Sequence, residues 1–147
     1  MKTQVLSIEQ MRHLQKLGVD TSGASMMYHF WVNKKYKNCF LLSADTTTPY
    51  DSENVPTFTL QDMLEMMPKK ILIEMENDFC RSVEAFFLDV SLNICNDNWQ
   101  CGYIHFSKRE DYFCHKYENT DLLTCAYETL CWCAENGYLK GGENENK

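Results

Sequence analysis

The segment EAFFLDVSLN, residues 84–93, shows the clearest alternation of apolar and polar side chains in this chain. Apolar residues stand at every second position, namely Phe86, Leu88, Val90 and Leu92, and the polar residues Asp89, Ser91 and Asn93 follow the last three of them. Successive side chains of a β-strand point to opposite faces of its sheet, so the pattern predicts a half-buried strand.

The neighbouring segments predict further strands. ILIEMEN (71–77) lies before the first stretch, and WQCGYIHF (99–106), which carries bulky side chains on both faces, lies after it. Nearer the N-terminus, two-residue alternation over residues 26–32 is followed by a polar stretch and then by CFLLSAD (39–45). That arrangement is typical of a β-hairpin.

Three segments have helical periodicity. The first follows Ser7, which with Gln10 forms the pattern of a capping box, and ends before Gly18. The second runs from Leu60 to about Met67, and the third covers residues 121–136. Residues 46–56 and 108–120 have the composition of loops.

Together these elements predict an α+β fold in the order α-β-β-α-β-β-β-α. Adjacent strands joined by short turns favour an antiparallel sheet of about five strands, with the helices packed on one side. A chain of 147 residues fits a single domain, which we expect over residues 1–140. The last residues, GGENENK (141–147), are expected to form a flexible acidic tail.

Composition indicates a globular protein, with 44% hydrophobic and 24% charged residues. No apolar run approaches the roughly 20 residues that span a bilayer, and the first residues lack the apolar segment of a secretory signal. We therefore expect a cytoplasmic protein with no membrane partner, whose eight cysteines are reduced.

The net charge of −7 is unevenly distributed. Residues 1–44 carry two acidic and six basic residues, whereas residues 45–89 carry ten acidic and three basic residues. An acidic chain does not follow nucleic-acid phosphates well, so direct nucleic-acid binding is not expected. The acidic middle is interpreted either as a solvated surface or as a face for a basic partner.

The stretch TDLLTCAYETLCWCAENGYLK (120–140) raises the question of a reactive or metal-binding site. A helix turns about 100° per residue, which places Cys133 in the expected buried stripe and sends Cys125 and Cys131 in other directions. The three thiols are therefore not expected to meet on one ion.

A metal site elsewhere in the chain is an alternative to protein binding. Its candidate ligands are Cys101, His105, Cys114 and His115. In a strand, the four residues from Cys101 to His105 span about 13 Å, too far for one ion. Phosphate-cradling loops and the common hydrolase and metalloprotease motifs are absent from the sequence. We expect no catalytic residue and no cofactor.

Two tryptophans stand outside the apolar patterns of their elements. Trp132 lies away from the expected stripe of the last helix, and Trp31 lies opposite the apolar side of the first strand. Each is either covered by another segment or exposed, and exposed tryptophans are enriched at binding hot spots. The candidate partner contacts are Trp132, Trp31, Glu74, Glu76 and Asp78.

A small-ligand site is the main alternative to protein binding. The basic N-terminal third offers side chains that could hold an anion such as a nucleotide: Tyr28, His29, Lys34, Lys35 and Lys37. A homo-oligomer is compatible with either function.

Three segments, residues 6–26, 56–71 and 121–139, resemble small proteins of gut Bacteroidales prophages and mobile elements. The resemblance rests on the TLQD-type start of the second helix and on the A-Y-LCW-ENGYL pattern of the third. It implies a bacterial host cell, a host or phage protein as partner, and inhibition of a host defence component as one role. It carries over no activity, cofactor or catalytic residue.

Overall fold

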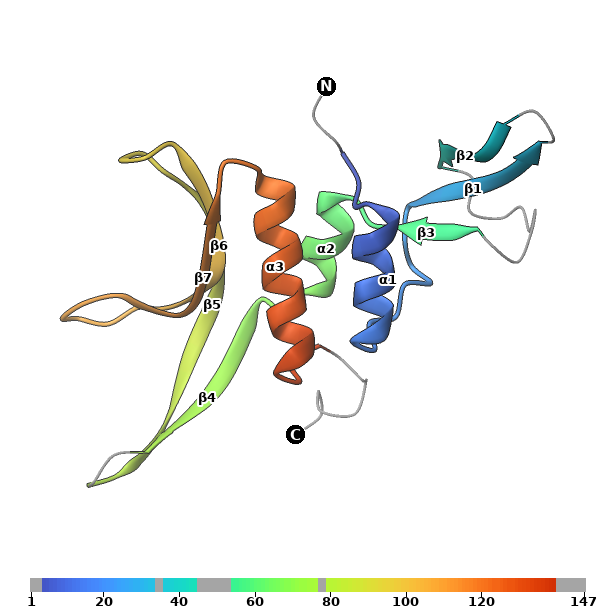
Figure 1. The fold of residues 1–147 in the computed structure, drawn as a ribbon. Helices are drawn as coiled ribbons and strands as arrows, with labels where there is room; N and C mark the ends of the chain where they lie inside the picture. The colour runs from blue at the N-terminus through green and yellow to red at the C-terminus, as the bar shows by residue number, and fades with distance from the viewer. Residues whose placement is uncertain (1–3, 34–35, 45–53, 77–78, 140–147) are drawn as a thin grey trace. The chain divides into compact units, whose positions relative to one another are not determined.

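The computed structural model describes residues 4–33, 36–44, 54–76 and 79–139, with the backbone alone described for residues 29–33 and 36–43. The elements are α1 (Ile8–Lys16), β1 (Met26–Asn33), β2 (Tyr36–Ser43), β3 (Val55–Thr57), α2 (Leu60–Met66), β4 (Lys70–Glu76), β5 (Arg81–Asn93), β6 (Asn98–His105), β7 (Tyr112–Asn119) and α3 (Leu122–Glu135) (Figure 1). They fall into two compact units, Met1–Glu65 and Met66–Lys147. One domain over residues 1–140 stays a prediction, and the tail at 141–147 lies outside the described residues.

The α+β class and the antiparallel pairing are confirmed, with the strands divided between two sheets instead of one. Their orders are β2-β1-β3 and β4-β5-β6-β7. The prediction of loops was wrong for β3 and β7. Strand β3 was not predicted because it contains Pro56, and proline is unusual in strands. Proline is tolerated in an edge strand, and β3 lies at the edge of its sheet. In β7 polar side chains occupy both faces, so hydrophobic alternation does not mark it.

In the first unit, α1 begins and ends at the residues that the sequence indicates. Gln10 N donates to Ser7 Oγ (3.1 Å), and Ser7 N donates to Gln10 Oε1 (2.9 Å), which confirms the capping box. Gly18 has a φ of 86° and ends the helix in the left-handed region that glycine favours. Met11 and Leu14 of α1 are fully buried.

Hydrogen bonds of Asp62 hold the first turn of α2 in place in the same unit. The residue is 8% exposed. Its carboxylate accepts hydrogen bonds from Ser25 N (3.0 Å) and Thr59 N (2.9 Å), and Thr59 Oγ1 accepts from Asp62 N (3.2 Å). Burial alone raises the pKa of Asp62, but the bonds from Ser25 and Thr59 outweigh it and hold the pKa below its ordinary value. Thr59 therefore caps the start of α2.

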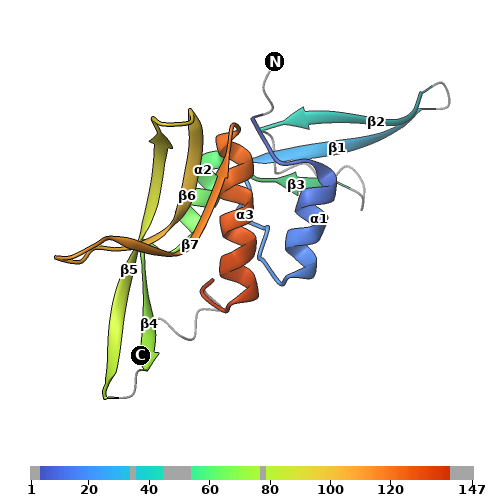
Figure 2. The ribbon, with the colours of Figure 1, turned by 60° about the vertical axis from the view of Figure 1, so that its left-hand side comes forward.

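In the second unit, α3 lies against β6 and β7 on one face of the four-stranded sheet (Figures 1 and 2). We call this the inner face and the opposite side the outer face. Three side chains of α3, one turn apart, each reach a successive inner-face residue of β6. Cys125 Sγ donates to Trp99 O (3.3 Å), Thr129 Oγ1 to Cys101 O (3.1 Å) and Cys133 Sγ to Tyr103 Oη (3.5 Å).

The spacing of these contacts follows from backbone geometry. Four helical residues rise about 6 Å, and two strand residues rise about 6.6 Å. A helix lying along β6 therefore brings positions 125, 129 and 133 opposite positions 99, 101 and 103 in turn. Cys125 and Cys133 of α3 are small donors in a helix–sheet interface.

The expected buried stripe of α3 was therefore incomplete. The prediction that Cys125 and Trp132 lie away from the buried side is wrong, because Cys125 is fully buried and Trp132 packs against aromatic rings of the sheet. The helix also buries Ala126, Leu130 and Cys131. A helix buried over most of its circumference has no single apolar stripe that periodicity can identify.

Candidate protein-binding surface

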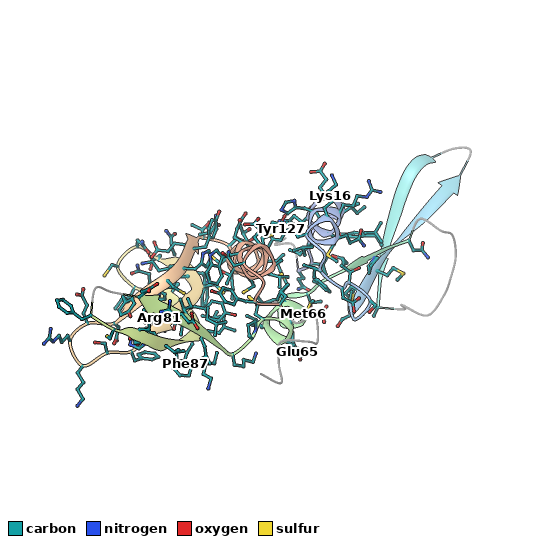
Figure 3. All side chains as sticks on the ribbon, turned by 90° about the horizontal axis from the view of Figure 1, so that it is seen from below. Lys16, Glu65, Met66, Arg81, Phe87 and Tyr127 are labelled. Atoms are coloured by element: carbon teal, nitrogen blue, oxygen red, sulfur yellow. The ribbon has the colours of Figure 1, made fainter. Side chains whose placement is uncertain are left out.

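The outer face of the four-stranded sheet carries a group of apolar side chains. Directly paired residues of antiparallel strands share a face, and the register joins Phe87 to Ile104 and Ile104 to Phe113. The ring of Phe106 lies 6.1 Å from that of Phe87. Figure 3 labels Phe87 on β5. We call this group the outer patch: Leu72, Val83, Phe87, Ile104, Phe106 and Phe113.

The outer patch is open to solvent. Leu72 and Val83 are each 59% exposed, Phe87 is 41% exposed and Phe106 is 60% exposed. Single exposed apolar residues are ordinary on protein surfaces, but a contiguous group of large ones marks an interaction site. The sheet is thus covered by α3 on one face and exposes apolar side chains on the other.

Two of the predicted contact residues lie beside the outer patch. Glu74 pairs with Val83 in the register of β4 and β5, and Glu76 pairs with Arg81. Both glutamates are exposed. Glu76 Oε1 lies 3.3 Å from Arg81 Nε, whereas Glu74 has no ion-pair partner among the residues that the structure describes. The Glu74 carboxylate thus stands at the edge of the apolar surface.

Beyond Phe87 the outer face becomes polar, and its groups bond to one another. Gln100 Nε2 donates to Ser91 Oγ (2.9 Å) and Asp89 Oδ2 (3.3 Å), and Ser91 Oγ donates to Asp89 Oδ2 (3.0 Å). Glu118 accepts from Lys116 Nζ at 3.4 Å. These side chains already have partners within the sheet, so the outer patch ends at this boundary.

Trp132 belongs to an aromatic cluster inside the second unit. Its ring stacks on His115 with a centroid distance of 4.6 Å and lies 5.2 Å from Tyr138 and 5.7 Å from Tyr103. Burial lowers the pKa of His115. The position of Trp132 matches the alternative in which other segments cover it. The side chain of Trp31 and all of Asp78 lie outside the described part of the chain.

The four candidate metal ligands do not gather into one cluster in the described part of the chain. Cys101 lies under α3, His115 lies under Trp132, and His105 contacts Glu84. Cys114 is exposed. Over residues 4–33, 36–44, 54–76 and 79–139, no three His, Cys, Asp or Glu side chains gather where they could hold a metal ion.

One group of side chains contains the residue types of a hydrolase triad. Ser82 Oγ donates to Glu84 Oε1 (3.4 Å), and Glu84 Oε2 lies 3.0 Å from His105 Nε2. A nucleophilic serine must bond to the imidazole, with the acid on the far side of the ring. Here the acid lies between the two, and His105 Nδ1 contacts the Ala85 carbonyl at 2.9 Å. This order does not activate Ser82.

The candidate anion site in the first unit falls mostly outside the described side chains. The hydroxyl of Tyr28 donates to Leu6 O (3.2 Å). Lys34, Lys35 and the side chains of His29 and Lys37 are not in the described part. A nucleotide site there stays a prediction.

The outer patch was missed in the sequence although a signal for it was present. WQCGYIHF carries bulk on both faces, and Phe87 follows Phe86 directly, so large apolar residues occupy the face that alternation assigns to solvent. In a sheet covered on one side only, such residues are exposed.

No helix in the described part of the chain is long and apolar enough to span a membrane. Searches of protein-family models, curated proteins and solved structures gave no match to the chain.

Proposed function

We propose that this chain is a non-enzymatic protein-interaction module whose outer patch binds a partner protein with an apolar, basic surface. The observation that carries the proposal is the solvent exposure of Leu72, Val83, Phe87 and Phe106 on one sheet face. Burying such a surface against a partner is favourable by about 25 cal/mol per Å² of apolar area.

The net charge of the second unit favours one class of partner protein. Residues 66–147 contain fourteen acidic and eight basic residues, a balance of −6. Glu74, which has no ion-pair partner in the described part of the chain, stands next to Leu72 and Val83. Electrostatic complementarity with a unit of net negative charge speeds association with a basic partner.

The resemblance to prophage and mobile-element proteins supplies the cellular setting of the proposal. The partner is a host or phage protein in the cytoplasm of a bacterial cell, and inhibition of a host defence component is the role that this setting favours. Protein binding through a sheet face needs no cofactor, metal or nucleic acid.

Affinity capture with matched variants tests the proposal. The patch variant carries Leu72→Ser and Phe106→Ser on the outer face. The control variant carries Val90→Ser and Leu92→Ser, which remove two exposed apolar side chains (36% and 45%) from the inner face. Truncated hot-spot residues cost about 2 kcal/mol or more, roughly 30-fold in affinity.

We expect the wild type and the control variant to retain the same basic protein, and the patch variant to lose it. Glu74→Lys should weaken the same interaction, and raising the salt concentration should reduce the difference between Glu74→Lys and the wild type. Equal recovery with the patch and control variants would contradict the proposal.

A further inference from the structure

Strand β5 is paired on both sides over only part of its length. Its 13 residues run from Arg81 to Asn93. Strand β4 pairs with residues 81–87, whereas β6 pairs with residues 87–93. The β4–β5 hairpin therefore extends beyond the end of β6, as Figures 1 and 2 show. Over residues 81–86 the side of β5 that faces away from β4 has no neighbouring strand in the described part of the chain.

Two hydrogen bonds show which backbone groups face this open side. Leu88 N donates to Lys69 O (2.9 Å), on the β4 side. Alternate residues of an antiparallel strand direct their backbone groups to opposite neighbours, so the groups of Arg81, Val83 and Ala85 point away from β4. The contact of Ala85 O with His105 Nδ1 of β6 (2.9 Å) gives the same direction independently.

The open edge has little protection against pairing. Proteins usually block such edges with proline, lysine, bulges or a covering segment. Here the edge residues are Arg81, Val83 and Ala85, and the pairing of β4 with residues 81–87 is regular throughout. On this edge, His105 Nδ1 contacts the carbonyl oxygen of Ala85. Val83 N–H and C=O are left without a hydrogen-bond partner among the residues described.

We propose that a second copy of this chain pairs with this edge, so that the two β5 strands run antiparallel about a two-fold axis at Val83. Each Val83 then exchanges N–H···O bonds with the Val83 of the other copy. Each Ala85 N–H donates to the Arg81 carbonyl of the other copy. The two hairpins form one continuous sheet in the order β4-β5-β5-β4 across the axis.

The length of the edge fits a second copy. The pairing sets the partner's Arg81, the first residue of its β5, opposite Ala85. Phe87, two residues further on, is the first residue paired with β6. The incoming strand therefore ends before it reaches β6. A two-stranded hairpin is marginally stable in water, and pairing gives each hairpin the additional strands that it lacks.

The side chains also fit their symmetric partners. In this register Arg81 faces Ala85, Ser82 faces Glu84 and Val83 faces Val83, so no like charges lie directly opposite one another. Glu84 of one copy comes opposite a serine hydroxyl that can donate to it. The pairing extends the sheet sideways, so it leaves the outer face uncovered and does not depend on the proposed function.

Sedimentation velocity of the full chain over a wide concentration range tests the proposal, with two substitutions at one position. Val83→Pro removes the N–H that faces the open edge while leaving the β4 bonds of Ser82 and Glu84, and proline is tolerated at such a position. Val83→Thr keeps the N–H and the β-branched shape. We expect the wild type and Val83→Thr to dimerise, and Val83→Pro to raise the dimer dissociation constant about tenfold or more.

A wild type that stays monomeric at every concentration, or a dimer that Val83→Pro leaves unchanged, would overturn the pairing. Amide hydrogen exchange of the wild type keeps the test decisive if Val83→Pro does not fold. The Val83 and Ala85 amides should become protected as the concentration rises. Fast exchange of both at the highest concentration would overturn the proposal as well.

Discussion

His105 Nε2 in β6 lies 3.0 Å from a carboxylate oxygen of Glu84 in β5, at the point where the pairing of these two strands ends. The other ring nitrogen contacts the Ala85 carbonyl. The pair thus fastens the last residue of β6 to the free part of β5.

A double-mutant cycle should measure this connection. His105→Gln and Glu84→Gln, alone and together, should give a coupling of about 0.5–1 kcal/mol in the free energy of unfolding, because both side chains are more than two-thirds buried. Arg81 and Glu76 form the control pair. Their side chains are 80% and 70% exposed, so we expect no measurable coupling. Equal coupling in the two pairs would contradict this account.

The stacking of His115 on Trp132 predicts a pH dependence of stability. Burial lowers the pKa of His115 below its ordinary value of 6.5, so the unfolded chain takes up the proton at a higher pH than the folded chain does. The free energy of unfolding should therefore fall as the pH drops below about 6.5. Denaturant titrations between pH 7 and pH 5 measure the slope.

His115→Phe keeps a ring on Trp132 and removes the titrating group. We expect a smaller loss of stability over this pH range in the variant than in the wild type. If the two chains lose the same free energy of unfolding, protonation of His115 is not the cause.

The cysteines of α3 should react slowly with alkylating reagents in the folded protein. Burial raises the pKa of Cys125, Cys131 and Cys133 to about 11 in each case, so at pH 8 about one thiol in a thousand is the reactive thiolate. Cys80 and Cys95 are exposed and should be labelled first by iodoacetamide.

Mass spectrometry of partly labelled protein follows each cysteine separately. In denaturant the difference between α3 and the exposed cysteines should disappear. Rapid labelling of Cys125 or Cys133 in the folded chain would show that α3 does not bury its thiols against β6.

Gly102 in β6 is the position where a side chain cannot be accommodated. A Cβ there collides with the His115 carbonyl oxygen and lies 2.9 Å from Lys116 Cα, both of which belong to the backbone of β7. Gly102→Ala should therefore lower the free energy of unfolding by about 1–3 kcal/mol.

Gly23→Ala is the matched control, because a Cβ at Gly23 meets nothing within 4 Å and its φ lies outside the left-handed region. We expect that variant to keep the stability of the wild type within about 0.5 kcal/mol. Thermal or chemical unfolding of both variants measures the difference, and equal stability of the two would disprove the close approach of β6 and β7.

Local signals in the sequence predicted the elements that depend on local chemistry. Ser7 with Gln10 located the start of α1, and Gly18 located its end. Glycine also follows α3, where Gly137 has a φ of 76°. These features depend on a few neighbouring residues, so the sequence contains the information that determines them.

Features that depend on long-range packing could not be predicted in this way. Whether β1 and β5 share a sheet is decided by pairing between distant residues, which alternation within each strand does not report. Trp132 seemed to lie on the wrong side of its helix because the ring that covers it, His115, belongs to a strand that periodicity missed. The candidates Glu74 and Glu76 fell beside the outer patch. That the apolar residues of the patch share one sheet face with these glutamates follows only from the register of the sheet.

Site-specific photo-crosslinking tests most directly whether the outer patch binds a partner protein. A photoreactive amino acid replaces Leu72 in one chain and Ser91, in the polar part of the same face, in another. In cells that express each chain, we expect Leu72 to form an adduct with a basic protein other than a second copy, and Glu74→Lys to reduce that adduct. Adducts of equal yield at Leu72 and Ser91, or none at Leu72, would contradict the account.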